Sequence, residues 1–282
     1  MSERPVSTGV LGSWQKVSTP WHPALRPFLD GYVGYREDSG MPLRLRTMPT
    51  GSVTLIINLG EPLKLITMPH PGFGGVAYPA FVAGMHDGPG LYEHPGGQFG
   101  IQVDLTPLGA YRLLGVPMRV LTNVAVDLGD LLGPRAGSVV ARLAETPSWA
   151  QRFDLLDELL LARLARGPVP SPEVMRAWRL LAGTAGRVTI TELTAEVGWS
   201  RKHLVDRFKE QIGLSPKVMA RVLRFQHAKA MLDRPAPAPV AEVAVACGYY
   251  DQAHLNREFR ALAGFTPTEM LASRIPGGGI SG

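Results

Sequence analysis

The sequence predicts an α+β multidomain protein, with a β-rich N-terminal domain, trailing helices and an all-α C-terminal domain. Three observations support this. The chain has 282 residues, a length typical of two domains. Short β-branched runs separated by Gly and Pro clusters fill its first half. A pattern of helical residues occurs twice near its end, and such a repeat indicates one supersecondary unit used twice.

The first 20 residues contain Gly, Ser and Thr without a periodic apolar pattern, and we expect residues 1–20 to form a flexible arm. The β-rich domain is expected over residues 21–167. Its clearest strands are predicted at residues 52–58, 63–67 and 99–105, where β-branched or alternating residues lie between turn signals. Many short strands of this kind favour a small barrel or sandwich.

Helices are expected to follow these strands within the same domain. Thr106 and Pro107 are typical of an N-cap and a first helical position. Apolar residues at three- and four-residue spacing then predict helical segments at residues 130–132, 139–143 and 153–164. The last of these is richer in leucine than one buried face needs, so we expect it to pack on the barrel and possibly on a second subunit. The Gly-Pro-Val-Pro sequence at 167–170 indicates the domain boundary.

The C-terminal domain is expected over residues 171–275, with a tail at 276–282. Its two copies of the repeat give helix-turn-helix units at residues 190–213 and 240–264. Glu192 and Gly198 match residues 50 positions later, and five further pairs match 51 positions later. Those pairs are His203 and His254, Leu204 and Leu255, Phe208 and Phe259, Gly213 and Gly264, and Pro216 and Pro267. One residue has therefore been gained just after the glycine of the second turn.

Capping signals place the helices of this domain. Pro172 begins a helix with Ser171 as N-cap, and Thr189 or Thr191 begins the next, which ends at Gly198. Ser200 caps the helix that follows. Ser215 and Pro216 open a long helix, which the Pro-rich residues 234–239 end, and Thr266 with Glu269 forms a capping box for the last helix.

A helix-turn-helix unit buries one face of its second helix and leaves the other free to enter the major groove. Leu204, Phe208 and Ile212 are predicted to face inward in the first unit, and Leu255 and Phe259 in the second. The residues predicted to face outward or to flank that face are Arg201, Lys202, Val205, Asp206, Lys209, Asp251, Gln252, Asn256, Arg257 and Arg260. Two such helices in one chain can lie about 34 Å apart, one turn of duplex. The alternative is that these are solvated faces of an all-α domain.

The charge distribution is uneven in a way that favours a polyanion partner. Residues 1–170 hold 14 basic and 14 acidic residues, whereas residues 171–282 hold 15 and 10. The whole net charge of +5 therefore belongs to the part with the repeat. Ordinary solubilising charge explains the excess equally well, but a basic domain beside a neutral one also suits a nucleic-acid partner.

Residues 199–216 (WSRKHLVDRFKEQIGLSP), 220–232 (ARVLRFQHAKAML) and 247–267 (CGYYDQAHLNREFRALAGFTP) resemble the AraC/XylS family of bacterial transcription regulators. The resemblance covers about residues 171–273. It implies two helix-turn-helix subdomains joined by a long helix, with both recognition helices inserted in neighbouring major grooves of promoter DNA. A recognition helix is the second helix of each unit.

The family resemblance assigns roles to named residues. The base-contact candidates are Arg201, Lys202, Val205, Asp206, Asp251, Gln252, Asn256 and Arg257. The phosphate-contact candidates are Ser200, Lys209, Lys217, Arg221, Arg224 and Arg260. Many relatives carry Arg where this sequence has Asp206, which is expected either to accept from a cytosine amino group or to pair with Arg207 or Lys202. Arg221 and Arg224 have an alternative too, an ion pair with Asp233 or Glu210.

In such regulators the N-terminal domain usually senses a small molecule, dimerises, or does both, and many relatives use a cupin-like barrel there. The resemblance therefore implies a small-molecule effector, a homodimer and contact with RNA polymerase as partners. An apolar pocket inside the barrel has nine aromatic candidates for its lining, although core packing explains each equally well. These are Trp21, Phe28, Tyr32, Tyr35, Phe73, Tyr78, Phe81, Tyr92 and Phe99.

Other chemistries have weak support. His86, Glu93 and His94 can hold a divalent metal in principle, but a polar loop explains them better, so no metal and no other cofactor is predicted. The sequence has no phosphate-binding loop and no G-x-S-x-G motif, and Cys247 is expected to be a buried small hydrophobe, so we expect no enzyme. Trp199, Tyr249 and Tyr250 are expected to be packing residues.

The sequence also bears on the compartment. The single cysteine fits a reducing compartment, and the chain shows neither a secretory signal nor a segment that would span a membrane, so the expected location is the cytoplasm with no membrane partner. The leading hypothesis is a sequence-specific DNA-binding regulator. The alternatives are a ligand-binding or metal-dependent enzymatic barrel tethered to a helical interaction module, and a non-specific architectural DNA binder.

Overall fold

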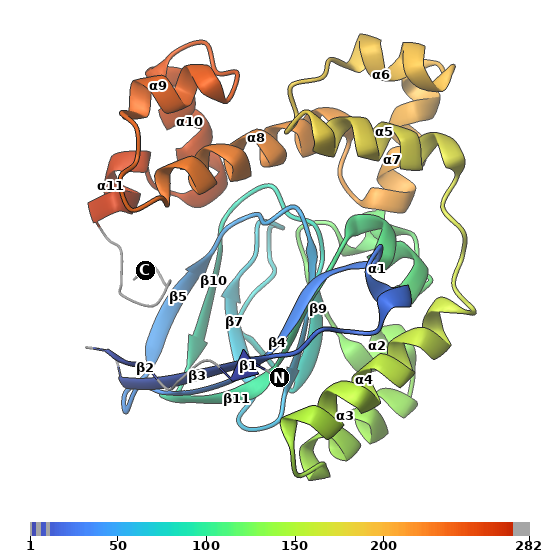
Figure 1. The fold of residues 1–282 in the computed structure, drawn as a ribbon, viewed down its shortest axis with the longest axis vertical. Coiled ribbons are helices and arrows are strands. Elements are labelled where there is room, and N and C mark those ends of the chain that lie inside the picture. Colours follow the sequence, from blue (N-terminus) through green and yellow to red (C-terminus); the bar gives the residue numbers. More distant parts are fainter. Residues whose placement is uncertain (1, 4–6, 10–11, 273–282) are drawn as a thin grey trace.

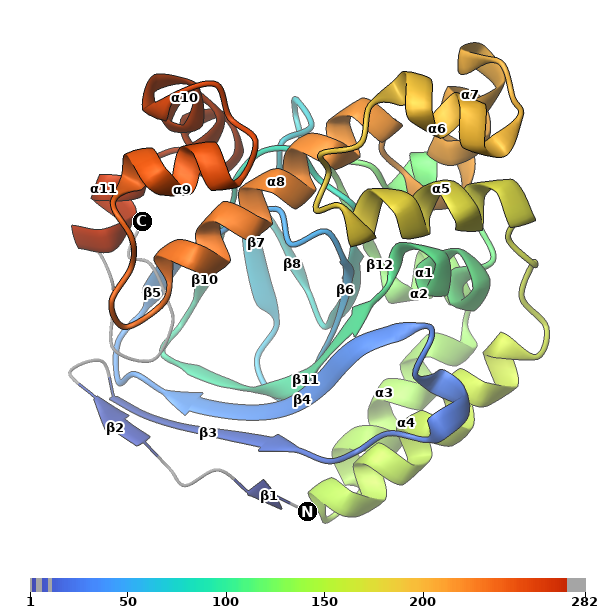
Figure 2. The same cartoon turned by 45° about the horizontal axis from the view of Figure 1, so that its top comes forward.

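A computed structural model describes residues 2–3, 7–9 and 12–272, and shows a β-rich part beneath an arch of helices (Figure 1). The strands form two antiparallel sheets. The larger has the order β1-β3-β4-β11-β6-β9-β12 with β2 paired to β3, and the smaller has the order β5-β10-β7-β8. The two sheets face each other (Figure 2), and residues of both line a cavity between them. The predicted fold class, β-rich and then all-α, is confirmed.

The strand bounds agree with the predicted runs. The first strands are β1 (Ser2–Glu3), β2 (Ser7–Gly9), β3 (Gly12–Ser18), β4 (Leu29–Asp38), β5 (Leu43–Thr47) and β6 (Val53–Asn58). They are followed by β7 (Leu63–Thr67), β8 (Val76–Tyr78), β9 (Ala80–Ala83), β10 (Gly90–His94), β11 (Gly97–Leu105) and β12 (Ala125–Asp127). The segments expected at 52–58, 63–67 and 99–105 are β6, β7 and most of β11.

Alternation along the strands decides which side chains reach the interior of the barrel. In β4, Val33 and Tyr35 line the cavity, whereas Tyr32 stacks on Phe153 outside the sheet at 4.9 Å between ring centroids. The cavity side of the larger sheet also carries Thr54, Ile56, Gln98 and Gln102. This face mixes polar and apolar side chains, so it is unlike a close-packed core.

Helices cover the outer face of the larger sheet. They are η1 (Pro23–Leu25), α1 (Pro107–Leu114), η2 (Met118–Leu121), α2 (Leu128–Leu132), α3 (Arg135–Glu145) and α4 (Trp149–Leu164). Thr106 caps α1 as predicted, since its hydroxyl accepts from the Gly109 amide at 3.0 Å. Helix α4 packs on α1 and η1, and its leucines Leu155 and Leu161 join the same core. Leu159 is half-buried and is not part of that core, and packing of α4 on a second subunit stays a prediction.

The C-terminal helices form the arch. They are α5 (Pro172–Gly183), α6 (Ile190–Val197), α7 (Arg201–Ile212), α8 (Pro216–Leu232), α9 (Val240–Ala246), α10 (Gln252–Ala263) and α11 (Pro267–Ala272). Thr189, not Thr191, is the N-cap of α6, in a full capping box with Glu192. The box predicted for Thr266 and Glu269 is also present, with the Thr266 amide donating to the Glu269 carboxylate at 2.6 Å.

One expectation about the N-terminus is wrong. Residues 1–20 were expected to form a flexible arm, but Gly12–Ser18 forms β3 and pairs with β4 from Ser13 to Val17. Val17 is fully buried, so this segment belongs to the barrel core. Its polar residues hid that role, because a strand with one buried side chain has no strong apolar pattern. The tail expected at 276–282 lies outside the described residues.

Within the described part of the chain, no helix combines the length and the apolar character that crossing a bilayer requires.

Candidate nucleic-acid interface

Helices α6 and α7 form one helix-turn-helix unit, and α9 and α10 form the other. Each turn contains a glycine in the left-handed region, Gly198 with φ 71° and Gly248 with φ 78°. Side chains with a Cβ rarely adopt this conformation, which is why the repeat has glycine at both places. The recognition helices α7 and α10 are both 12 residues long. The sequence repeat therefore corresponds to two equivalent structural units.

The inner faces of the recognition helices are buried as predicted. Leu204, Phe208 and Ile212 of α7 are fully buried, and so are Leu255 and Phe259 of α10. Helix α8 contacts both units. Its 17 residues span about 25 Å at 1.5 Å per residue, so it acts as a spacer between the units.

Most of the predicted base-contact residues are accessible. Arg201, Lys202 and Asp206 are exposed on α7, and Val205 beside them is half-buried. In the second unit Asp251 and Gln252 are exposed at the start of α10, and Arg257 is exposed in its middle. Two basic residues therefore lie at the start of α7, and an amide and a guanidinium lie on the open side of α10, which are groups that bond base edges.

Three of these residues have constraints that the sequence did not show. Asp251 is the N-cap of α10, and its carboxylate accepts from the His254 amide at 2.7 Å. Asn256 is half-buried, and its side-chain oxygen is buried without a protein partner among the described residues. Near Asp206, the pairing expected with Arg207 is wrong, because Arg207 binds Glu210 at 2.6 Å one turn further along α7.

Two phosphate-contact candidates are engaged inside the protein. Arg221 of α8 donates to both carboxylate oxygens of Glu258 in α10, at 3.1 and 3.0 Å. Arg224 donates to the Gly186 carbonyl at 2.9 Å. The alternative partners expected for these arginines, Asp233 and Glu210, are therefore wrong. Arg221 instead ties the connecting helix to the second recognition helix.

The other phosphate-contact candidates are on the surface. Lys209, Lys217 and Arg260 are exposed, and Arg260 lies 3.6 Å from the Glu269 carboxylate. Ser200 is the N-cap of α7 and accepts from the His203 amide at 3.3 Å. Its hydroxyl group is committed to capping, while its position at the helix start remains exposed.

The aromatic residues at the turns differ from one another. Trp199 packs edge-on against His203 at 4.5 Å, and Tyr249 packs in the same way against His254 at 5.3 Å. These equivalent pairs brace the two turns, as expected for packing residues. Tyr250 does not, because it is 90% exposed just before the start of α10, so the packing role expected for it is wrong.

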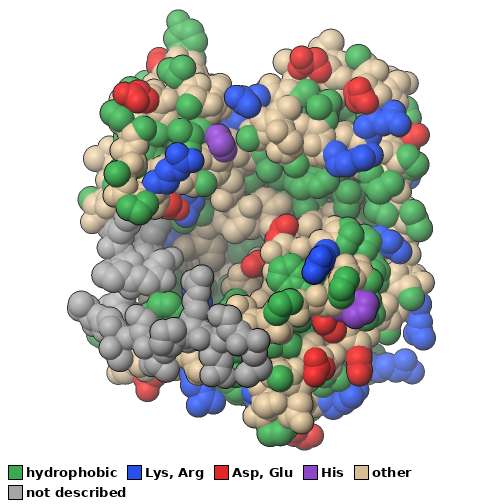
Figure 3. Space-filling model, in the orientation of Figure 1, with side chains coloured by type: hydrophobic (Ala, Val, Ile, Leu, Met, Phe, Trp, Pro, Cys, Tyr) green, Lys and Arg blue, Asp and Glu red, His purple; other side chains and the backbone are tan. Residues whose placement is uncertain are grey.

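The recognition helices lie on the side of the arch that is turned away in Figure 1, since α7 stands behind α5 and α6, and α10 behind α9, in both ribbon views. On the near face the helical half has two lobes separated by a notch, and basic side chains are mixed there with acidic ones (Figure 3). That face has no uniform basic surface.

The barrel contains a second candidate site, a cavity of about 580 Å³ between the two sheets. Apolar side chains such as Leu65 and Phe81 form much of its wall, and His86 is among the lining residues. Gln226 and Lys229 of α8 also line it, so the helix that joins the DNA-binding units closes one side of the cavity. A pocket of this size suits a small organic molecule.

The structure shows which of the candidate residues predicted for the barrel line the cavity and which do not. Of the nine aromatic candidates for the pocket, Tyr35, Phe81 and Tyr92 line the cavity, and burial raises the pKa of both tyrosines. His86, Glu93 and His94 have separate partners: the His86 ring nitrogen Nδ1 bonds the Gly88 carbonyl at 2.7 Å, Glu93 pairs with Arg44 and His94 accepts from the Gly96 amide. Among the described residues, no cluster of three or more His, Cys, Asp and Glu side chains suits a metal ion.

Sequence reasoning missed Gln226 and Lys229 as cavity residues. Their three-residue spacing places both on one face of α8, but nothing in the sequence says that this face meets a barrel. It also missed that Tyr250 is exposed beside the second recognition helix, because an aromatic residue beside a turn is most often buried.

Two helix-turn-helix units joined by one connecting helix are typical of a DNA-binding domain with two recognition helices. Residues 193–273 match the family model described as a helix-turn-helix domain, and residues 19–127 match that of a domain of unknown function (DUF6597). Together with the relatives described next, the first match shows that the C-terminal domain belongs to the AraC-type helix-turn-helix domains, which are DNA-binding domains of transcription regulators.

Curated relatives are similar to part of this chain. An uncharacterized HTH-type transcriptional regulator of Bacillus subtilis, YbfI, is 32% identical over 107 residues, which is 36% of this chain and 38% of the relative. The regulator MtrA of Neisseria gonorrhoeae is 35% identical over 71 residues, 25% of this chain and 23% of that protein. The chain thus aligns with less than half the length of these relatives.

Two solved structures are similar to different lengths of this chain. A probable AraC family transcriptional regulator from Rhodopseudomonas palustris is 31% identical, covers 38% of this chain and 100% of its own, and has a TM-score of 0.34. ToxT from Vibrio cholerae covers 86% of this chain and 97% of its own, at 10% identity and a TM-score of 0.46.

Proposed function

We propose that this protein is a transcription regulator that binds specific duplex DNA through α7 and α10 and binds a small molecule in its barrel. The observation that supports the first part is the pair of equivalent units with open recognition faces. Gln252 and Arg257 are exposed on α10, and Arg201 and Lys202 on α7. The family of the C-terminal domain supports the same role.

The two units are expected to contribute unequally. Gln252 and Arg257 present groups that read adenine and guanine edges, so the second unit supplies most of the base specificity. In the first unit, Asp206 is exposed on the same helix as Arg201 and Lys202. A carboxylate is repelled by phosphate, so that helix relies on its two basic residues and on Lys209 for backbone contacts.

The cavity supports the effector part of the proposal. Its wall is apolar in large part, but Gln98, Gln102 and Thr54 supply groups that can orient a ligand by hydrogen bonds. Contact with RNA polymerase and self-association are further expectations of a regulator, and analytical ultracentrifugation with and without DNA measures the second.

The test is a binding assay with sites selected from a random duplex library. Gln252→Ala and Arg257→Ala should each weaken binding to the selected site by about 1–3 kcal/mol. Gln151→Ala and Arg142→Ala are the matched controls, because both side chains are exposed on the helices beside the barrel. Equal affinity of the wild type for selected and random duplexes would refute sequence-specific binding. Unchanged affinity in both α10 variants would exclude that helix as the base reader.

A further inference from the structure

The loop between β9 and β10, residues 84–89, touches the cavity and the ends of both recognition helices. His86 lines the cavity and is buried. On the side facing the helices, a Cβ added to Gly213, the residue after α7, would lie 3.4 Å from Cβ of Met85. A Cβ added to Gly264, the residue after α10, would lie 3.7 Å from Pro89. Gly213 and Gly264 are equivalent positions of the repeat, so one loop meets the same point of both units.

Hydrogen bonds connect this loop to the first unit. The Asn123 backbone N–H donates to the Met85 carbonyl at 3.0 Å. The Asn123 side-chain oxygen accepts from the Asp87 backbone N–H at 3.0 Å, and its side-chain nitrogen donates to the Asp87 carboxylate at 2.9 Å. Asn123 has φ 63°, an uncommon conformation for a residue with a side chain. Next to it, the Thr122 hydroxyl donates to the Gly213 carbonyl at 2.9 Å. A shift of the loop would therefore be passed to the end of α7.

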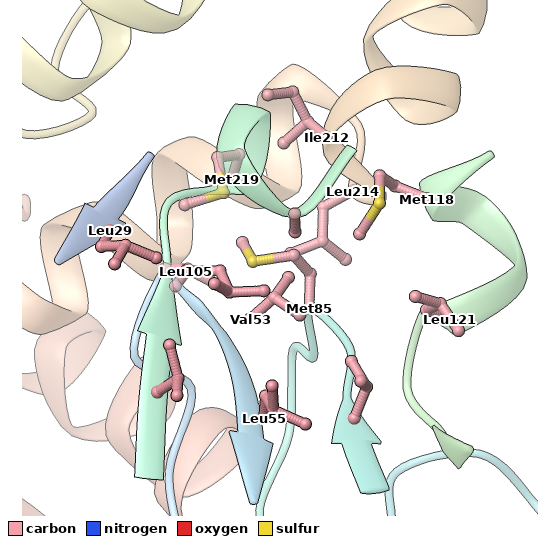
Figure 4. Close-up of a cluster of buried hydrophobic side chains, with 14 of the residues drawn as sticks. Leu29, Val53, Leu55, Met85, Leu105, Met118, Leu121, Ile212, Leu214 and Met219 are labelled. Carbon is pink, nitrogen blue, oxygen red and sulfur yellow. The ribbon is translucent and has the colours of Figure 1, made fainter. Parts of the chain in front are cut away.

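Apolar packing reinforces the same contact. Met85 and Met118 from the barrel side belong to one buried cluster with Ile212 at the end of α7, Leu214 after it and Met219 in α8, and Figure 4 shows these side chains converging above the sheet. Packed side chains transmit displacements because the interior holds few voids.

The second unit is held differently. Arg46 of β5 lines the cavity, and its guanidinium group donates to the Ala263 carbonyl at the end of α10 at 3.3 Å. The same guanidinium lies 5.7 Å from the ring centroid of Phe265. The second recognition helix thus contacts the cavity wall through one long polar side chain and the 84–89 loop.

We propose that the 84–89 loop and Arg46 couple occupancy of the barrel cavity to the C-terminal ends of both recognition helices. A molecule in the cavity displaces His86 or Arg46, and the displacement changes the relative placement of α7 and α10 and hence their fit to neighbouring grooves. The regulatory consequence rests on the proposed function, whereas the mechanical coupling between cavity and helix ends does not.

The experiment measures hydrogen exchange at the Gly213 and Gly264 amides, which donate to Lys209 and Arg260 at the helix ends. Ala83→Leu fills the cavity from β9 and stands in for a ligand, with Leu91→Phe on β10 as a second filling variant should the first not fold. Ala77→Leu, on the exposed surface of β8, is the matched control. Filling should change exchange at both glycines by about threefold or more, and the control should not.

The connections are then cut. Thr122→Val removes the bond to Gly213, and Arg46→Met removes the bond to Ala263. Thr146→Val and Arg44→Met are the controls, since Thr146 bonds a carbonyl in α3 and Arg44 lies on the same strand outside the cavity. In the cut double variant, filling the cavity should no longer change exchange at the helix ends.

The outcomes separate the two proposals. Unchanged exchange rates at Gly213 and Gly264 in the filled variants would overturn the coupling. So would independence of the two changes, in which the combined effect of filling and cutting on the exchange rate equals the product of the separate effects within a factor of about two. A clear exchange response in a protein that does not prefer its selected duplex would leave the coupling in place and refute the regulator.

Discussion

The ion pair between Arg221 and Glu258 gives the sharpest prediction, because the sequence assigned Arg221 to DNA and the structure assigns it to the protein. The side chains are 29% and 15% exposed, and both carboxylate oxygens accept from Nε. Breaking a fully buried pair costs about 3–5 kcal/mol, and an exposed pair contributes about 0–1 kcal/mol. With this partial exposure, we expect Arg221→Met to lower the free energy of unfolding by about 2 kcal/mol.

The assay is urea unfolding at neutral pH, with the midpoint and slope measured for each variant. Arg176→Met is the control, because Arg176 and Glu196 form a pair at 3.8 Å with side chains 52% and 51% exposed, and its loss should change stability by less than about 0.5 kcal/mol. Glu258→Gln should destabilise in the same direction as Arg221→Met. Equal midpoints for Arg221→Met and Arg176→Met would refute the reasoning. A phosphate contact by Arg221 would instead show as a salt dependence of DNA binding that falls by about one charge in the variant.

Further predictions concern the barrel and the second turn. Gly34→Ala should lower the free energy of unfolding by about 1–3 kcal/mol, because the added Cβ would overlap the Trp149 ring. Gly97→Ala should not, because the nearest atom to its added Cβ lies 3.9 Å away, and thermal unfolding compares the two variants. Burial lowers the pKa of His86 from 6.5, and the Gly88 carbonyl and Asp87 partly oppose this shift. The unfolded chain therefore binds more protons than the folded one, so stability should fall as the pH drops below about 6.5. In His86→Gln the urea midpoint should fall less over the same pH range. Tyr250→Ala should change the unfolding free energy by less than about 0.5 kcal/mol, and a several-fold loss of duplex binding with stability intact would place its ring against DNA.

Local signals predicted the helical domain well, because its turns and caps depend on neighbouring residues. Gly198 and Ser200 mark their elements by conformation and hydrogen bonding within a few positions. Arg221 could not be assigned from the sequence, because its partner Glu258 lies 37 residues away across the fold. The same holds for β3, whose place in the barrel comes from pairing with β4 and from a single buried valine.

The residues of the candidate sites also differ in whether local sequence signals or contacts between distant residues determine them. The outward positions of α7 and α10 follow from helical periodicity, so Arg201 and Gln252 were predicted to be accessible and are. The cavity is built from many strands and from one face of α8. Nothing near Lys229 in the sequence indicates a barrel beside it, and only the tertiary fold brings the two together.

The buried cluster that joins Met85 and Met118 to Ile212, Leu214 and Met219 has a consequence for how the chain can be divided. Ile212 at the end of α7 and Met219 in α8 pack against the barrel residues Met85 and Met118, and the end of α10 meets the barrel through Arg46 and the 84–89 loop. A fragment cut at residue 171 would expose Ile212, Leu214 and Met219, because their partners Met85 and Met118 would be missing. Grafting this C-terminal domain onto another sensor would therefore require a new apolar surface that covers the junction of α7 and α8.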